Sequence, residues 1–290
     1  MKTDTKVKIS ITGKNVGFVG IDLQKDFSDN PKYNGALPVA GASEDLERLI
    51  KFFGRVASKL KEDGNTSLSC LCTQDWHPEL HISFDIYWTD KDGNHPSSAT
   101  VVSFADTISK WINSAGNHNL DSLYIKAIES NGMLHIVWPV HCVKETTGAE
   151  ICDEWLDVLN KYNIPMIPLY KGMVASAEMY GALAFESYPL YSDKEASSQI
   201  DKNTKIFLNF VAGKDIVFIT GQALSHCVLT TIKQFANIVH YINSEELKKC
   251  YLLIDTSSCI PGFEEATMKE IEKLEKAGLN VVKTTDVEFI

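Results

Sequence analysis

The feature that most constrains the fold is an alternation between short segments that are apolar throughout and longer segments with helical periodicity. Strands that are apolar on both faces are typical of a parallel sheet covered by helices on each side. We therefore expect an α/β fold, with three αβα layers around a central, mostly parallel sheet of about six strands. The segments expected to form these strands are Val16–Ile21, Leu68–Thr73, Ile164–Tyr170, Ile216–Thr220, Tyr251–Ile254 and Asn280–Lys283.

Amphipathic segments between these strands predict the covering helices. The first follows the first strand, and the apolar residues that recur on one of its faces are Leu46, Leu49, Ile50 and Phe53. A second helix is expected from about Cys227 to Ile238. A third is expected at Glu264–Ala277, where Gly278 is a stop signal.

Two polar stretches break the alternation, at residues 85–130 and 190–205. The first contains the pattern of a helix at Val102–Ile112, and the second is expected to be a surface excursion. Neither has the composition of a linker between domains. We interpret both as insertions into a single domain that spans residues 1–290.

The charge of the chain argues against nucleic acid as a partner. The 290 residues include 38 acidic and 28 basic side chains, a formal net charge of −10, and the two arginines are Arg48 and Arg55. Such a chain repels phosphate backbones and has few bidentate phosphate ligands.

Cysteine usage and hydropathy indicate the compartment. Seven cysteines at irregular spacing favour a reducing environment over a disulfide framework. The segment Met1–Lys6 lacks the apolar stretch of a signal peptide, and no run reaches the ~18 apolar residues of a membrane span. We expect a soluble, cytoplasmic protein without a membrane partner.

Reactive side chains follow several of the predicted strands. Asp22 closes the first strand, Asp75 and His77 follow the second, and Lys171 follows the third. Cys227 begins a helix after a later strand. An aspartate after a strand is by itself more often a turn residue, and a lone cysteine more often a small buried hydrophobe. Ligands of open α/β sheets bind at the carboxyl ends of the strands, so the convergence of these residues favours a functional site.

Cys227 has the setting of a nucleophile. It lies in the turn Gly221–Val228, where a helix N-terminus favours a thiolate and backbone N–H groups can hold an oxyanion. Cys142 follows His141 directly and is expected near the site without acting in it. The four cysteines interpreted as structural are Cys70, Cys72, Cys152 and Cys250.

One carboxylate and two imidazoles are candidates for a metal site. Asp75 and His77 form an Asp-x-His pair, and His141 lies three residues after Trp138. This set suits Zn²⁺, Fe²⁺ or Mn²⁺ with open coordination positions. On spacing alone, a hydrogen-bonded Asp–His pair with a core histidine is the favoured alternative.

Together these motifs resemble the nicotinamidase/pyrazinamidase branch of the isochorismatase-like cysteine hydrolases. They occur in the family's order and cover most of the chain outside the two insertions. The matching segments are Gly20–Phe27, Thr73–Pro78, His81–Phe84, Trp138–Val143, Thr147–Glu150, Tyr170–Gly172, Gly221–Val228 and the segment beginning at Asp255. The resemblance implies the isochorismatase-like hydrolase fold.

The resemblance implies a catalytic triad of Asp22, Lys171 and Cys227. The thiolate would attack a carboxamide carbon, and Asp22 would take the thiol proton and pass it to the leaving ammonia, while Lys171 would favour both anions. The N–H groups of Ala223 and Cys227 would hold the oxyanion, and the peptide bond before Ala223 would be cis. Water would then hydrolyse the thioester to a carboxylic acid.

The resemblance also implies a metal and an aromatic pocket. The ligands of one divalent transition metal would be Asp75, His77 and His141. Zn²⁺ is the first choice, with Fe²⁺ or Mn²⁺ as alternatives, and the metal would bind the pyridine nitrogen of the substrate. Phe27 and Trp138 would sandwich the ring, and Tyr180 would line the pocket.

Several neighbouring residues have competing interpretations. Asp26 is interpreted as a turn residue, His81 as a residue behind the site with metal ligation as the minor alternative, and His226 as a structural neighbour of the nucleophile. The chain also departs from the family pattern. Gln222 stands where an apolar residue is usual, and Leu224-Ser225 stands where Thr-Asp is usual.

Three functions follow from these observations. The first is a nicotinamidase, which converts nicotinamide and water to nicotinate and ammonia and would serve NAD salvage. The second is the same hydrolysis of a different small amide, because the insertions can alter the pocket. The third is a non-catalytic metal- or ligand-binding relative, against which the intact triad argues. Relatives range from monomers to larger rings, so a homo-oligomer is a further candidate assembly.

Overall fold

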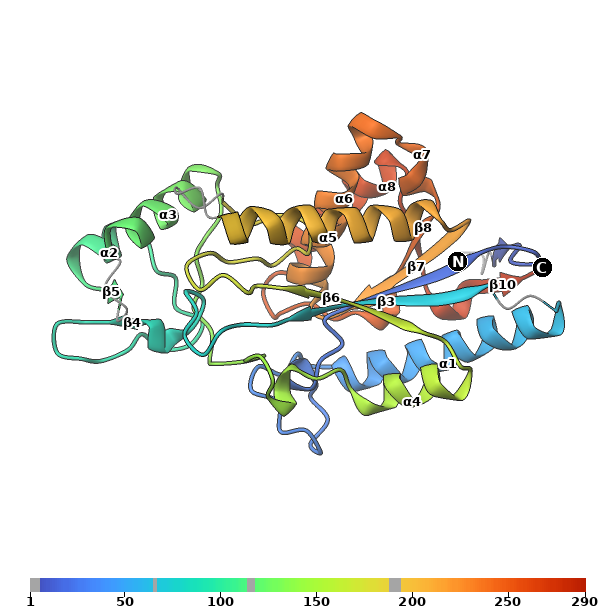
Figure 1. Cartoon of the computed structure of the whole chain (residues 1–290), viewed down its shortest axis with the longest axis horizontal. Helices are drawn as coiled ribbons and strands as arrows, with labels where there is room; N and C mark the ends of the chain where they lie inside the picture. Colours follow the sequence, from blue (N-terminus) through green and yellow to red (C-terminus); the bar gives the residue numbers. More distant parts are fainter. Residues whose placement is uncertain (1–5, 65–66, 114–117, 188–193) are drawn as a thin grey trace.

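A computed structural model describes residues 6–64, 67–113, 118–187 and 194–290. Its centre is a six-stranded parallel sheet in the order β6-β3-β2-β7-β8-β9 (Figure 1). The strands are β2 (Val16–Ile21), β3 (Leu68–Asp75), β6 (Met166–Lys171), β7 (Ile216–Gly221), β8 (Cys250–Leu253) and β9 (Asn280–Val282). Each matches a predicted apolar segment, so the α/β class and the parallel sheet are confirmed.

Helices cover both faces of the sheet and complete the three predicted layers (Figure 1). On one face lie α1 (Ala42–Glu62) and α4 (Asp153–Lys161). On the other face lie α5 (Lys194–Ala212), α6 (Leu229–Ile242) and α8 (Glu264–Ala277). Gly278, with φ of 119°, ends α8 at the predicted stop, because glycine adopts this left-handed conformation readily.

The central strand shows why these segments are apolar throughout. Along β2, Phe18 packs into the cluster beneath α1 and α4, whereas Val19 and Ile21 pack into the cluster on the opposite face. The Phe18 ring lies 4.8 Å from the Phe53 ring and 5.2 Å from the Phe218 ring, measured between centroids. Alternate side chains of a strand point to opposite faces, so both sets must be apolar when helices cover both.

The first predicted insertion, at 85–130, folds into a module beyond the carboxyl end of the sheet, at the left of Figure 1. Its elements are β4 (Trp88–Thr89), α2 (Phe104–Ser109), β5 (Ile112–Asn113) and α3 (His118–Ser130). The helix predicted over Val102–Ile112 begins later, because Ser103 caps it through a reciprocal bond with Asp106. The core of this module includes Val174 and Met179, so the module packs against the segment after β6.

The interpretation of 190–205 as a surface excursion is wrong for its described part. Residues 190–193 lie outside the described residues, and residues 194–205 form the first part of α5. This helix buries Ile200, Phe207 and Val211 against the sheet and the module. Polar side chains predominate in residues 194–205, so the composition of this segment does not indicate the buried face of the helix.

Short elements complete the described chain. β1 (Val7–Ile9) pairs in parallel with β10 (Val287–Phe289), a pairing that the sequence analysis did not predict. Among the described residues, no helix combines the length and apolar character needed to cross a bilayer. The remaining helices and helical turns are η1 (Lys25–Phe27), η2 (Asp85–Tyr87), η3 (Thr147–Ala149), η4 (Leu224–Val228), α7 (Glu245–Lys248), η5 (Ile254–Thr256) and η6 (Thr284–Asp286).

Buried histidines make the stability of the fold sensitive to acid. Burial lowers the pKa of His135 to about 4, and its Nε2–H donates to the Ile82 carbonyl at 3.0 Å. In the unfolded chain the His135 imidazole becomes protonated near pH 6.5, whereas in the folded chain it stays neutral down to about pH 4. The contribution of His135 to the free energy of unfolding is therefore fully present above pH 6.5. It is lost as the pH falls from 6.5 to 4, by up to about 1.4 kcal/mol per pH unit.

We expect His135→Gln to reduce that pH dependence, measured as the free energy of unfolding in denaturant between pH 6.5 and 5. Replacement of the exposed His240 by Gln is the control, and its unfolding free energy should change with pH as steeply as that of the native protein. An unchanged slope in His135→Gln would contradict the assignment of a buried neutral imidazole.

Candidate active site

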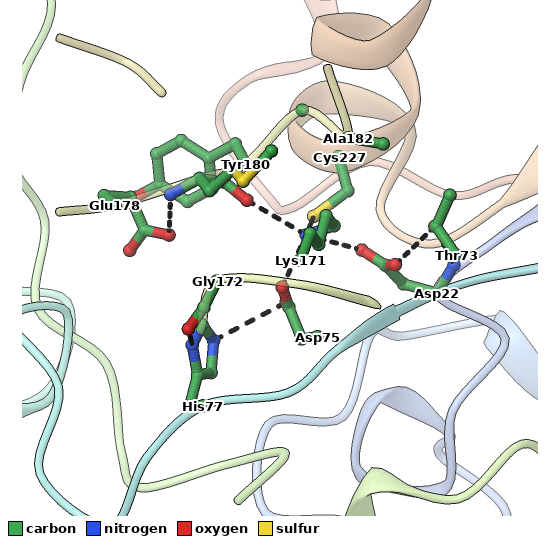
Figure 2. Close-up of polar contacts among 12 residues, drawn as sticks. Asp22, Thr73, Asp75, His77, Lys171, Gly172, Glu178, Tyr180, Ala182 and Cys227 are labelled. Atoms are coloured by element: carbon green, nitrogen blue, oxygen red, sulfur yellow. Dashed lines mark hydrogen bonds and ion pairs between the residues drawn. The ribbon is translucent and has the colours of Figure 1, made fainter. Parts of the chain in front are cut away.

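The candidate site lies at the carboxyl ends of the central strands. The chain passes from β2 outward to β3 and β6, and then returns to build β7, β8 and β9 on the other side of β2. Asp22 follows β2, Asp75 ends β3, Lys171 ends β6, and Cys227 lies in the turn after β7. Open sheets bind ligands where the strand order reverses in this way, and the structure brings the four side chains together there (Figure 2).

The Lys171 ammonium is the centre of this group (Figure 2). Its Nζ lies 3.0 Å from Asp22 Oδ2, 2.5 Å from Asp75 Oδ1 and 3.7 Å from Cys227 Sγ. The side chain is fully buried. Burial alone would lower the pKa of Lys171, but the attraction of Asp22 and Asp75 outweighs it and raises this pKa well above its ordinary value. Lys171 is therefore a buried cation.

Asp22 and Cys227 face each other across this cation. The Thr73 hydroxyl donates to Asp22 Oδ1 at 2.6 Å and holds the carboxylate. Burial raises the pKa of the Cys227 thiol well above its ordinary value, although Lys171 opposes this shift. Cys227 Sγ and the carboxylates of Asp22 and Asp75 offer atoms within 4.8 Å of one another. The thiol thus rests protonated, with a proton acceptor nearby.

A second group, Asp75, His77 and His141, has the geometry of a metal site, with candidate ligand atoms within 4.8 Å of one another. His77 Nδ1 lies 2.9 Å from the Gly172 carbonyl, and His141 Nδ1 lies 2.7 Å from the Pro139 carbonyl. A carbonyl only accepts, so each Nδ1 carries the proton and each Nε2 keeps its lone pair.

The charge states of this group also fit a divalent metal. Burial lowers the pKa of His77 well below its ordinary value and that of His141 to about 4, so both rings are neutral at pH 7, as metal ligands must be. Burial raises the pKa of Asp75 to about 8 against the opposing charge of Lys171, and a bound cation would favour its ionised form. The group formed by Asp22, Asp75 and Cys227 is different, because the Lys171 ammonium already contacts all three.

Two residues that the sequence analysis placed outside the reaction have protein partners. His81 Nδ1 accepts from Ser83 N–H at 3.3 Å, and its Nε2 lies 3.3 Å from the Ala177 carbonyl. Its ring packs 4.1 Å from that of His77, behind the metal group. Asp26 Oδ2 accepts from Cys142 N–H at 2.7 Å, so this carboxylate holds the segment that carries His141.

A pocket opens onto Cys227 and His141. Phe27, Trp138 and Tyr180, predicted to contact the substrate, all line it, and Trp138 Nε1–H donates to the Tyr180 hydroxyl at 3.2 Å. The peptide bond between Gln222 and Ala223 is cis, as the resemblance implied. The full lining is Phe27, Leu37, Val39, Asp75, Trp138, His141, Glu178, Tyr180, Ala223, His226, Cys227 and Ile260.

The sequence analysis did not identify Glu178 or His226 as residues that line the pocket. Burial raises the pKa of Glu178, whose Oε1 accepts from Met179 N–H at 2.7 Å. The His226 ring packs 5.3 Å from Tyr180 and 5.9 Å from Trp138, and burial lowers its pKa to about 4. His226 therefore lines the pocket as a neutral aromatic ring. No motif marks Glu178, because its position follows from the path of the segment after β6.

Comparisons with known proteins agree with this fold. No family model matches the chain. The three-layer parallel sheet with a candidate site at its strand reversal is a doubly wound α/β fold. Within that class, the chain is similar to the nicotinamidase of Saccharomyces cerevisiae, with 27% identity over 263 residues that cover 90% of this chain and 96% of the relative.

Two solved structures show the same fold. The yeast nicotinamidase bound to the inhibitor nicotinaldehyde has 22% identity and a TM-score of 0.56, with coverage of 92% of this chain and 99% of that one. A protein of L. infantum in complex with nicotinate has 18% identity and a TM-score of 0.56, with coverage of 98% and 100%. The resemblance to the nicotinamidase/pyrazinamidase branch is confirmed.

The carbonyl of Gly172 that orients His77 allows a matched test of the metal group. A Cβ at Gly172, with φ of +67°, would lie 2.5 Å from His77 Cε1, whereas a Cβ at Gly13, with φ of +69°, would meet nothing within 4 Å. Both alanine variants carry the same backbone strain. We expect Gly172→Ala to weaken Zn²⁺ affinity by about 10- to 100-fold and Gly13→Ala to leave it unchanged, measured by competition with a chelator. Equal affinities in the two variants would contradict a metal site at His77.

Proposed function

We propose that the protein is a metal-dependent cysteine amidohydrolase, a nicotinamidase that converts nicotinamide and water to nicotinate and ammonia. The observation that carries this proposal is the contact of buried Lys171 with Asp22, Asp75 and Cys227 beside a pocket walled by aromatic rings. The similarity to yeast nicotinamidase supports the choice of amide.

The triad accounts for the covalent steps. Asp22 takes the proton from Cys227 Sγ, and the thiolate forms a bond to the carboxamide carbon. The C–N bond breaks as Asp22 returns the proton to nitrogen, so ammonia leaves and a thioester remains. Asp22 then takes a proton from water, whose oxygen bonds to the thioester carbon as the C–S bond breaks. The carboxylic acid leaves, and Asp22 returns the proton to Cys227 Sγ. Lys171 stays protonated and stabilises the thiolate and the carboxylate.

The carbonyl oxygen gains negative charge at each tetrahedral stage. The backbone N–H groups of Ala223 and Cys227 are the proposed donors to this oxyanion, because both belong to the turn after β7 that carries the nucleophile. Donors that are already fixed in the folded backbone stabilise such charge without reorganisation during the reaction.

Asp75, His77 and His141 are the proposed metal ligands, and their donor set suits Zn²⁺ first, with Fe²⁺ or Mn²⁺ as alternatives. When bound, the metal supplies a Lewis acid for the pyridine nitrogen of the substrate. Phe27 and Trp138, which line the pocket, are the proposed contacts to the two faces of the ring. Tyr180, which lines the pocket and accepts a hydrogen bond from Trp138 Nε1–H, is the third proposed contact.

The first measurement is ammonia release from nicotinamide. We expect Cys227→Ala to lower kcat by at least about 10³-fold, because Cys227 is the cysteine among the described residues that line the pocket. Cys250→Ala is the matched control, a buried cysteine of β8, and should retain activity. Ammonia release that persists in Cys227→Ala would contradict the thioester mechanism.

Removal of the metal tests the second half of the site. Dialysis against a chelator should lower kcat/KM for nicotinamide, and added Zn²⁺, Fe²⁺ or Mn²⁺ should restore it. Benzamide lacks the ring nitrogen, so it should be a poor substrate of the metal-loaded enzyme. Equal turnover of benzamide and nicotinamide would contradict metal-directed orientation of the ring.

A different small amide is the second candidate, and one observation favours keeping it. Glu178, which lies outside the segments that carry the resemblance, places a buried carboxyl in the pocket. A panel of amides separates the two substrates. A stoichiometric metal without turnover of any amide would instead indicate a non-catalytic binding protein.

A further inference from the structure

A chain of buried polar side chains connects the turn after β7 to helix α1. Gln222 begins this chain and is 3% exposed. Its Nε2 donates to Asp45 Oδ2 at 2.9 Å, and its Oε1 accepts from the Ser258 N–H at 3.3 Å. Both ends of the carboxamide are therefore engaged by partners distant in sequence.

Asp45 is itself buried and held by a cation. Arg48 donates from one NH2 group to Asp45 Oδ1 at 2.6 Å, and its Nε–H donates to the Asp255 carbonyl at 2.6 Å. A carboxylate only accepts hydrogen bonds, so Asp45 forces the NH2 end of Gln222 toward α1 and the oxygen end toward Ser258. The ion pair thus determines the orientation of the Gln222 side chain.

The backbone of the same turn is fixed at neighbouring points. Gln222 N–H donates to the Ile21 carbonyl at 2.9 Å, one residue before Asp22. Leu224 N–H donates to the Ser258 carbonyl at 2.7 Å. Ala223 lies between these anchors, so the position of its N–H relative to Cys227 depends on how Gln222 is held.

We propose that Gln222 is a positioning residue that aims the Ala223 N–H at the oxyanion, and that Asp45 and Arg48 hold Gln222 for this purpose. The inference rests on the proposed amidohydrolase function. Gln222 does not line the pocket and acts through its neighbour. The aim of one donor matters most when charge develops on the carbonyl oxygen.

Gln222→Met keeps the length of the side chain and removes both of its hydrogen bonds. We expect kcat for nicotinamide to fall about 10- to 100-fold, with KM and the inhibition constant of nicotinate changed less than about threefold. Nicotinaldehyde is a second probe, because the thiolate adds to its carbonyl carbon and the carbonyl oxygen becomes an oxyanion. Its inhibition constant should rise in parallel with the loss in kcat.

Alkylation of Cys227 by iodoacetamide separates positioning from general damage. In this reaction Sγ bonds to carbon and iodide leaves, so no oxyanion forms. The alkylation rate in Gln222→Met should match that of the native protein. Gln199→Met, in α5, is the matched control and should leave kcat and the nicotinaldehyde constant unchanged.

A reciprocal exchange provides rescue. Gln222→Glu alone places two carboxylates together and should lower kcat at least as much as Gln222→Met. Adding Asp45→Asn restores a donor and an acceptor across the contact, with the amide on position 45 and the carboxylate on position 222. This double variant should recover kcat by about 10-fold relative to Gln222→Glu alone.

The outcomes distinguish this inference from the proposed function. Native protein that hydrolyses nicotinamide while Gln222→Met keeps its kcat and its nicotinaldehyde affinity overturns the positioning role alone. Equal losses in alkylation rate, nicotinate affinity and kcat also overturn it, because they indicate general disorder of the site. Native protein that neither hydrolyses an amide nor binds nicotinaldehyde through Cys227 overturns both proposals.

Discussion

The buried ammonium of Lys171 is the interaction on which the site depends. A buried charge is costly unless opposite charges contact it, and here Asp22 and Asp75 do so from two other strands. Asp75 and Lys171 are direct partners in the ladder between β3 and β6, and Thr73, which holds Asp22, is paired with Ile21 of β2. A slip of one residue would reverse these side chains, so sheet register and site geometry are one constraint.

One cation serves two chemically different halves of the site. Asp22 and Cys227 form the half proposed to move a proton and make the thioester, and Asp75 belongs to the half proposed to hold a metal. Lys171 contacts the carboxylates of both Asp22 and Asp75, so a change of charge in one half alters the electrostatic potential in the other. A cation bound in the half proposed to hold a metal would therefore be coupled electrostatically to the ionisation of Asp22 and Cys227.

Much of this arrangement could be predicted from particular residues. The apolar run Val16–Ile21 indicated a buried strand, and its abrupt end at Asp22 indicated a site residue. Lys171 and Cys227 were found by the same reasoning, since parallel strands end at one edge. Segment 194–205 was misinterpreted because buried Ile200 is outnumbered by polar neighbours. Composition reports the exposed face of such a helix more strongly than its buried face.

The sequence by itself determined the local structure and the kind of chemistry, because apolar periodicity and the ends of strands are properties of short segments. Only the tertiary structure decided which distant groups meet. Glu178 enters the pocket through the path of a loop, and Gln222 meets Asp45 across 177 positions of sequence. The pairing of β1 with β10 likewise joins opposite ends of the chain. Such contacts depend on strand order and packing of the whole domain, which no local pattern encodes.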